Sequence, residues 1–263
     1  MDLNKASEVR AEAEGLFSAD LSAEWSVGDK PHGGYLMAVL TRAALAAAGG
    51  DRDPLAVSCE FLRPPEAGPA ELRTEVRKQG STVSSIGVAL EQHDAVRVTG
   101  TVTAGRLPDE EPAWAELPEF PVEPGPDALE FNTEFEGPSK IGWYMDTRFA
   151  RHNASLFTDR KPGDPLEYRA WFRSPDDHPD IFFALVAGDM LPPLPFNLGH
   201  IGWSPTVQLT ALLRAEPAPG WLRVQGNCRT VAGNWFDADA TVIDSRGRLV
   251  CQARQLALLA RKR

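Results

Sequence analysis

Residues 34–48 form the most apolar continuous segment of the chain. Within it only Thr41 and Arg42 are clearly polar, proline is absent, and Gly49–Gly50 follow directly. Because alanine and leucine dominate, the segment is predicted to be a helix that the two glycines end. Apolar residues cover nearly its whole circumference, and a helix of that kind is buried on all sides. A curved antiparallel sheet wrapped around the helix would bury it.

The segments that follow the helix have the pattern of strands. Residues 57–65, 70–80, 81–92 and 95–105 alternate or run apolar, are rich in valine and threonine, and are separated by proline, glycine or short polar turns. They predict about four antiparallel strands. Residues 107–139 are dense in proline and acidic residues, which is typical of a connecting segment rather than a core.

The strand pattern then returns. Candidate strands lie around residues 141–151 and 166–173, and a second helix is predicted between Pro179 and Pro192. Four more predicted strands follow, at 204–217, 220–233, 236–247 and 248–260.

The second strand run repeats the first at an interval of about 150 residues. Val57 precedes Val207, and Leu72 precedes Leu222, by this interval. The chain is therefore predicted to be an α+β protein of two tandem repeats, each with a long central helix wrapped by a curved antiparallel sheet. Residues 1–106 would form the N-terminal repeat, 107–139 the connecting segment and 140–263 the C-terminal repeat.

Charge and cysteine content reduce the number of possible partners and cofactors. The formal charge of −10 argues against nucleic acid or a membrane surface as a partner, because both are anionic. Three cysteines without metal-ligand spacing indicate free thiols, and we expect no metal site. The first fifteen residues or so are charged, helix-like and without an apolar signal core, which favours a cytoplasmic protein.

Three stretches carry a resemblance to a known family. They are HGGYLMAVLTRA at the first helix, and GWSPTVQLTALLRAEPAPGWL and DSRGRLVCQARQLALL in the second half. Their order and spacing resemble the type II acyl-CoA thioesterases, which have a double hot-dog fold. The resemblance implies hydrolysis of an acyl-CoA or acyl-carrier thioester without a metal or redox cofactor. The exposed sheet faces of such a fold also offer surfaces for a homo-oligomer.

The start of the first helix is the first candidate site. Free N–H groups at a helix N-terminus can stabilise the oxyanion that forms on a thioester carbonyl. Gly33 and Gly34 would let the thioester approach that backbone, with His32 and Tyr35 beside it as substrate-binding residues. Alternatively, the two glycines only permit a tight entry into the helix.

The second candidate site holds the attacking water. The resemblance implies that an aspartate, a threonine or serine, and a glutamine of the second repeat hold it. Gln255 matches the glutamine of the family, and Thr230 is the nearest candidate for the hydroxyl. Gln208 stands where many relatives carry an aspartate, and it shares one strand face with Thr210.

A glutamine cannot accept the proton of the water, so either hydrolysis is slower or the base comes from elsewhere. The candidate carboxylates are Glu60 and Asp189. Two other functions stay open: a hot-dog dehydratase or hydratase with His32 as the base, and a non-catalytic module that binds an acyl thioester.

Overall fold

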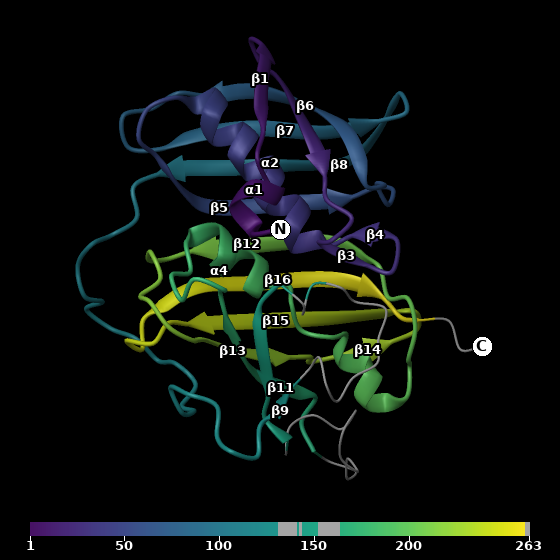
Figure 1. The fold of residues 1–263 in the computed structure, drawn as a ribbon, viewed down its shortest axis with the longest axis vertical. Helices are drawn as coiled ribbons and strands as arrows, with labels where there is room; N and C mark the ends of the chain where they lie inside the picture. The colour runs from purple at the N-terminus through teal and green to yellow at the C-terminus, as the bar shows by residue number, and fades with distance from the viewer. Residues whose placement is uncertain (131–140, 142–143, 152–163, 261–263) are drawn as a thin grey trace.

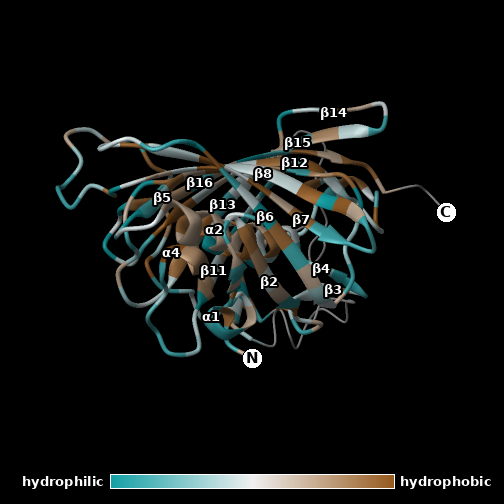
Figure 2. Cartoon of the chain, turned by 90° about the horizontal axis from the view of Figure 1, so that it is seen from above, coloured by the Kyte–Doolittle hydropathy of each residue, from teal (hydrophilic) through white to brown (hydrophobic). Residues whose placement is uncertain are grey.

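The computed structural model describes residues 1–130, 141, 144–151 and 164–260 of the chain. Its main feature is one 14-stranded antiparallel sheet, and β3 (Ser26–Val27) and β4 (Lys30–Pro31) form a separate pair (Figure 1). Seen from above in Figure 2, the sheet arches over two helices. The main cluster of buried residues includes residues of both helices and of strands from both halves.

The first half contains the predicted helix and four strands in the predicted order. The helix α2 spans Gly33–Ala48, and β5 (Asp53–Phe61), β6 (Gly68–Lys78), β7 (Ser84–Gln92) and β8 (Ala95–Gly105) follow it. The helix is almost entirely buried, as its unbroken apolar circumference predicts.

The second half contains a helix and four main strands after it. They are α4 (Ile181–Ala187), β12 (Thr206–Leu213), β13 (Leu222–Asn227), β15 (Trp235–Ile243) and β16 (Leu249–Leu258). Smaller elements complete this half: β9 (Leu129–Glu130), β10 (Asp146–Phe149), β11 (Glu167–Arg173), the 3-10 helix η3 (Leu194–Leu198) and β14 (Val231–Ala232).

The two halves have the same strand order. From the centre of the sheet outward, the first half runs β5-β8-β7-β6-β2, where β2 is Leu16–Leu21, and the second runs β12-β16-β15-β13-β11. The central strands β5 and β12 pair antiparallel, with Leu209 opposite Cys59 and Ala211 opposite Val57, so one continuous sheet joins the halves (Figure 1). The two halves therefore share one strand order, which a repeat of this kind requires.

The second helix is much shorter than the sequence pattern predicts. It has 7 residues against 16 in α2, so among the described residues a long central helix is present in the first half alone. Its start is fixed by Asp180, whose side chain accepts a hydrogen bond from the Phe183 N–H group. Its end is fixed by Gly188 and by the prolines a few residues later, which cannot continue a helix.

The N-terminal segment was predicted to be helix-like, and that prediction is wrong for most of it. Only α1 (Leu3–Ala6) is helical, whereas β1 (Arg10–Ala13) and β2 (Leu16–Leu21) are strands. β2 pairs with β6 and buries Phe17 and Leu21. Pairing within the sheet therefore determines the structure of this segment, and the helix propensity of the residues before it does not.

The proline-rich connecting segment contributes to the core at one point. Phe120 is 8% exposed and packs with Ala150, Trp171 and Trp221. The Trp171 indole also donates a hydrogen bond to the Pro121 carbonyl oxygen at 2.8 Å. The segment therefore covers the outer face of β11 and β13. No helix in the described residues is long and apolar enough to cross a membrane.

Candidate active site

The N-terminus of α2 lies against the chain that leaves α4. His32 is the N-cap residue of α2, and its side chain does not cap the helix. The Gly34 N–H group donates a hydrogen bond to Oδ2 of Asp189 at 2.7 Å. Within the described part of the chain, the Gly33 N–H group has no acceptor. A carboxylate of the second half thus completes the helix start of the first half, and one backbone donor stays available there.

Asp189 is a buried carboxylate with two partners from the first half. Its side chain is 7% exposed. Burial raises the pKa of its carboxyl group above the ordinary value, and the nearby His32 and the Gly34 N–H group partly oppose that shift. A carboxylate with a raised pKa is a stronger base once it is ionised, which is the property that proton abstraction from water requires.

His32 positions Asp189. Its Nε2 lies 3.1 Å from the Asp189 carbonyl oxygen and 3.5 Å from Oδ2. A carbonyl oxygen can only accept, so Nε2 carries a proton and donates it to this contact. The other ring nitrogen, Nδ1, is buried without a hydrogen-bond partner among the described residues. His32 is thus turned toward the Asp189 backbone and does not line the cavity beside it.

The two glycines of α2 permit this close approach. A Cβ atom at Gly33 would lie 2.7 Å from Oδ2 of Asp189. A Cβ atom at Gly34 would lie 3.0 Å from the Asp189 Cβ atom and 3.1 Å from the Val186 Cα atom. A side chain at either position would crowd Asp189, so the glycines allow the two halves to make contact here. This packing role is similar to the alternative interpretation of the sequence, in which the glycines only permit a tight entry into the helix.

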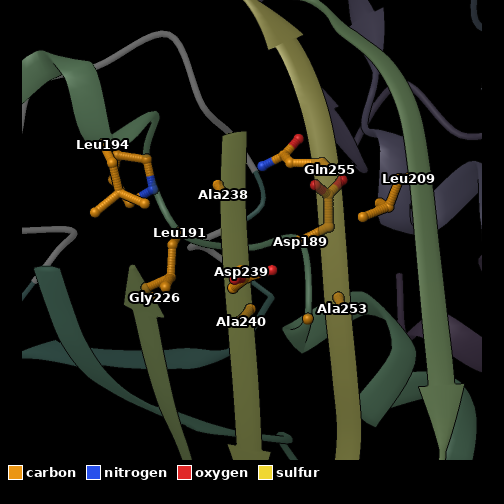
Figure 3. Close-up of a pocket in the computed structure, with 12 residues that line it drawn as sticks. Asp189, Leu191, Leu194, Leu209, Gly226, Ala238, Asp239, Ala240, Ala253 and Gln255 are labelled. Carbon is orange, nitrogen blue, oxygen red and sulfur yellow. The ribbon is translucent and has the colours of Figure 1, made fainter. Parts of the chain in front are cut away.

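Gln255 lies beside Asp189 on the inner face of the sheet. It is on β16, directly opposite Leu209 of β12 and Ala238 of β15. The Thr206 hydroxyl donates a hydrogen bond to Oε1 of Gln255 at 2.7 Å. This bond fixes the amide, and in Figure 3 the amide nitrogen lies on the Ala238 side, toward the cavity. The nitrogen can donate two hydrogen bonds there.

Asp189 and Gln255 both line a small cavity of about 20 Å³, enough for a single water molecule. Figure 3 shows the two side chains together, with the two leucines of the segment after α4 farther off. The complete lining is Gly188, Asp189, Leu191, Pro192, Leu194, Leu209, Gly226, Ala238, Asp239, Ala240, Ala253 and Gln255. Among the described residues there is no group of three or more His, Cys, Asp or Glu that could hold a metal ion.

Gln208 and Thr210 lie on the opposite face of the sheet. Gln208 is exposed and faces the exposed Glu60 across the β5–β12 pair. The Thr210 hydroxyl forms a hydrogen bond with the Ser58 hydroxyl at 2.8 Å. Because side chains alternate along a strand, the inward positions of β12 belong to Leu209 and its alternate neighbours. The structure therefore does not bring Gln208, Thr210 or Glu60 to the cavity.

Thr230 and Tyr35 also lie away from the cavity. Thr230 is exposed, and its N–H group donates to Oδ1 of Asp237 at 2.8 Å. The Tyr35 side chain is fully buried, and its hydroxyl donates to the Ala6 carbonyl oxygen at 2.7 Å. It ties the N-terminal segment to α2. The hydroxyl beside Gln255 comes from Thr206. This residue was not among the predicted site residues, although it lies in the stretch GWSPTVQLTALLRAEPAPGWL that carries part of the resemblance.

Two sequence models match most of the chain, and both describe acyl-CoA thioesterases. The N-terminal domain of these enzymes matches residues 21–105, and their C-terminal domain matches residues 109–259. The chain therefore belongs to the acyl-CoA thioesterase family that these two domains define.

The chain is also similar to individual proteins over nearly its whole length. An uncharacterized protein of Mycobacterium tuberculosis is 35% identical over 272 residues, which covers 93% of this chain and 91% of the relative. The crystal structure of a candidate thioesterase II from Thermobifida fusca has a TM-score of 0.88 and 32% identity, over 99% of this chain and 98% of the other. A hot-dog protein of unknown function from Alicyclobacillus acidocaldarius has a TM-score of 0.86 at 19% identity, covers 99% of this chain and 98% of its own, and shows the fold alone.

Proposed function

We propose that the protein hydrolyses an acyl thioester, with coenzyme A or an acyl carrier as the thiol, and that Asp189, Gln255 and Thr206 hold the attacking water. One observation carries the proposal. A buried carboxylate and an amide fixed by a hydroxyl meet at a cavity of about 20 Å³, beside a helix N-terminus. Family membership supplies the substrate class.

The proposed reaction needs only groups that this chain provides. The water in the cavity loses a proton to the Asp189 carboxylate while its oxygen attacks the thioester carbonyl carbon. The Gln255 amide orients the water because its Oε1 is already bonded to Thr206. When the tetrahedral intermediate collapses, the carbon–sulfur bond breaks, and Asp189 returns the proton to the departing thiolate. The products are a carboxylic acid and a free thiol.

The oxyanion of that intermediate would be stabilised at the start of α2. Of the two predicted glycine donors, the Gly34 N–H group is occupied by Asp189. The Gly33 N–H group is therefore the donor that we assign to the oxyanion, with the macrodipole of α2 behind it. His32 contributes by holding the Asp189 backbone rather than by touching the substrate.

The two other candidate functions have less support. A hydratase with His32 as its base would need a ring nitrogen that faces the substrate, but Nε2 contacts Asp189 and Nδ1 is buried. A non-catalytic binding module was suggested by the glutamine at position 208. Asp189 supplies a carboxylate from a different element, so that substitution does not leave the cavity without a base.

We also infer that each half is one hot-dog unit. The identical strand order of the halves supports this inference, although α4 is short. We retain 1–106 and 140–263 as the two units, with 107–139 as the connection.

Release of free thiol from a panel of acyl-CoAs tests the proposed function, and the chain offers two matched pairs of variants. Gln255→Ala should lower kcat/KM by about 10–1,000-fold, because it removes a fixed donor from the reaction centre. Gln208→Ala, the same change on the outer face, should stay within about twofold. Thr206→Val and Thr210→Val form the second pair, with the same ranking expected.

Three results would count against the proposed hydrolysis or its site. A folded wild-type protein that releases no thiol from any member of the panel would contradict the proposal. Loss of activity in Gln208→Ala equal to that in Gln255→Ala would remove the cavity from the mechanism. If the protein instead added water to an unsaturated acyl thioester, and His32→Ala abolished that reaction while Gln255→Ala did not, the hydratase would become the better hypothesis.

A further inference from the structure

The floor of the cavity is a row of very small residues that crosses three strands. Gly226 of β13 lies directly opposite Ala240 of β15, and Ala240 lies directly opposite Ala253 of β16. All three positions face inward and line the cavity. Large side chains usually fill such positions on the concave face of a sheet, so this row leaves a trough that runs across the strands below Gln255.

The roof of this trough is the segment that follows Asp189. Leu191 and Leu194 line the cavity from that side (Figure 3), and Pro192 between them is also part of the lining. Leu191 reaches farthest, because a Cβ atom at Gly226 would lie only 2.3 Å from the Leu191 Cδ1 atom. Leu191 therefore occupies the space that the missing side chain of Gly226 leaves, and it closes the trough at the end away from Gln255.

The chemistry of the trough changes from one end to the other. Asp189 and Gln255 are polar and lie where the proposed water would be held, whereas Leu191, Leu194 and the small residues are apolar. Asp239 also lines the cavity, but its carboxylate is paired with the exposed Arg254. A thioester whose carbonyl carbon lies next to that water would extend its acyl chain along the apolar part. The hydrophobic effect would hold the chain there.

Resting on the proposed function, we propose that this trough is the acyl site and that Leu191, seated over Gly226, limits it to short acyl groups of about two to four carbons. The cavity of about 20 Å³ has room only for the proposed water, so an acyl group enters the trough only as far as the side chains around it give way, and a short acyl group requires the least displacement. A longer acyl group must displace Leu191 from Gly226.

The test is the dependence of kcat/KM on acyl length, from acetyl-CoA to dodecanoyl-CoA. For the wild-type protein we expect a decrease of at least about tenfold between four and eight carbons. Leu191→Ala should move the optimum by about three carbons, the number of side-chain carbons it removes, and Leu191→Val by less. Leu198→Ala, an exposed leucine of η3 outside the cavity lining, should keep the wild-type profile.

Two failures can be told apart. A wild-type protein that releases thiol and prefers eight carbons or more, or a Leu191→Ala variant with an unchanged profile, overturns the assignment of the trough and leaves the proposed hydrolysis standing. If Leu191→Ala does not fold, the profile of Leu191→Val decides between these outcomes. Absence of thiol release with every chain length overturns the proposed function itself.

Discussion

The two helices begin in opposite ways although the two halves share one strand order. At α2 the N-cap and the next two residues are His32, Gly33 and Gly34, and the cap side chain makes no capping bond. At α4 the same three positions hold Asp180, Ile181 and Phe182, and Asp180 caps its own helix. One helix start has bare backbone and depends on a partner from the other half, whereas the other is complete in itself.

This difference means that two halves with one strand order contain, among their described residues, a single place where a carboxylate meets a bare helix start. Large side chains at the start of α4 cover its backbone, and the Phe182 ring is packed under the Arg42 guanidinium group at 3.8 Å. At the start of α2 the glycines admit Asp189, and the contact between the halves becomes the place where a carboxylate and a helix N-terminus meet. The proposed reaction therefore depends on a feature in which the two halves differ, and not on one that they share.

The largest effect should come from replacing the aspartate at each helix start. Asp189→Asn removes the proposed base and should lower kcat by about 100–10,000-fold. Asp180→Asn is the matched change at α4, and asparagine is also a good N-cap, so both activity and stability should be nearly unchanged. Steady-state thiol release from short acyl-CoAs measures both variants. Equal loss of activity in the two would show that the helix starts do not differ in chemistry.

The glycines of α2 offer a second, smaller test. In an ordinary exposed helix, replacing glycine by alanine stabilises the protein by up to about 1 kcal/mol. Gly34→Ala should instead destabilise it by about 1–3 kcal/mol, because the new Cβ atom would lie within 3.1 Å of the Val186 backbone, where yielding is costly. Urea unfolding measures the change, and Ala46→Gly at an exposed site of α2 calibrates propensity alone.

A higher unfolding midpoint for Gly34→Ala would contradict that account of the contact. It would mean that the start of α2 tolerates a side chain, as the start of α4 does. The glycines would then serve substrate access instead of the packing of the two halves.

Much of the fold could be predicted from the sequence because it follows from burial. The helix around Leu40 is apolar all round, and the alternation around Val88 and Val102 marks strands with one buried face. The N-terminal strands could not be predicted this way. The segment around Arg10 is charged and fully exposed, and only its pairing across the sheet makes it a strand.

The candidate site was harder to predict because it depends on register and on contacts between halves. Gln255 was predicted by resemblance, and the structure brings it to the cavity. Gln208 was assigned to the same site, but a strand reverses its face at each residue, and position 208 faces outward. Asp189 was only one of two candidate carboxylates, since no sequence pattern shows that Gly34, 155 positions away, donates to it.

The raised pKa of Asp189 gives a third prediction, for pH. Because the ionised carboxylate acts as the base, kcat/KM should rise up to about tenfold per pH unit until the pH passes the raised pKa, and then level off. The midpoint should lie above the ordinary value of 3.8. A pH profile of thiol release measures this limb. A plateau that extends unchanged below the ordinary value would show that the group is not the base.

The same pKa fixes the sign of a stability effect. The folded state favours the protonated carboxyl, so this contribution to stability is fully present below 3.8 and is lost as the pH rises through the higher folded-state pKa. The Asp189→Asn variant lacks this pH-dependent contribution to stability. The free energy of unfolding of the variant relative to wild type should therefore increase over this pH range, and a decrease would reverse the sign that burial gives.

The smallest expected effect concerns the cap of α4. Asp180→Ala removes the side-chain oxygen that accepts from Phe183 N–H at 2.7 Å, and should lower the free energy of unfolding by about 1 kcal/mol. Its kcat should stay within about twofold of wild type, because the capped helix start lies outside the proposed mechanism. Thermal or urea unfolding, together with thiol release, measures both quantities.

Asp180→Asn, which keeps the cap, should restore the stability. A loss of activity in Asp180→Ala comparable to that in Asp189→Asn would mean that both helix starts serve the reaction, and the asymmetry between them would lose its chemical meaning.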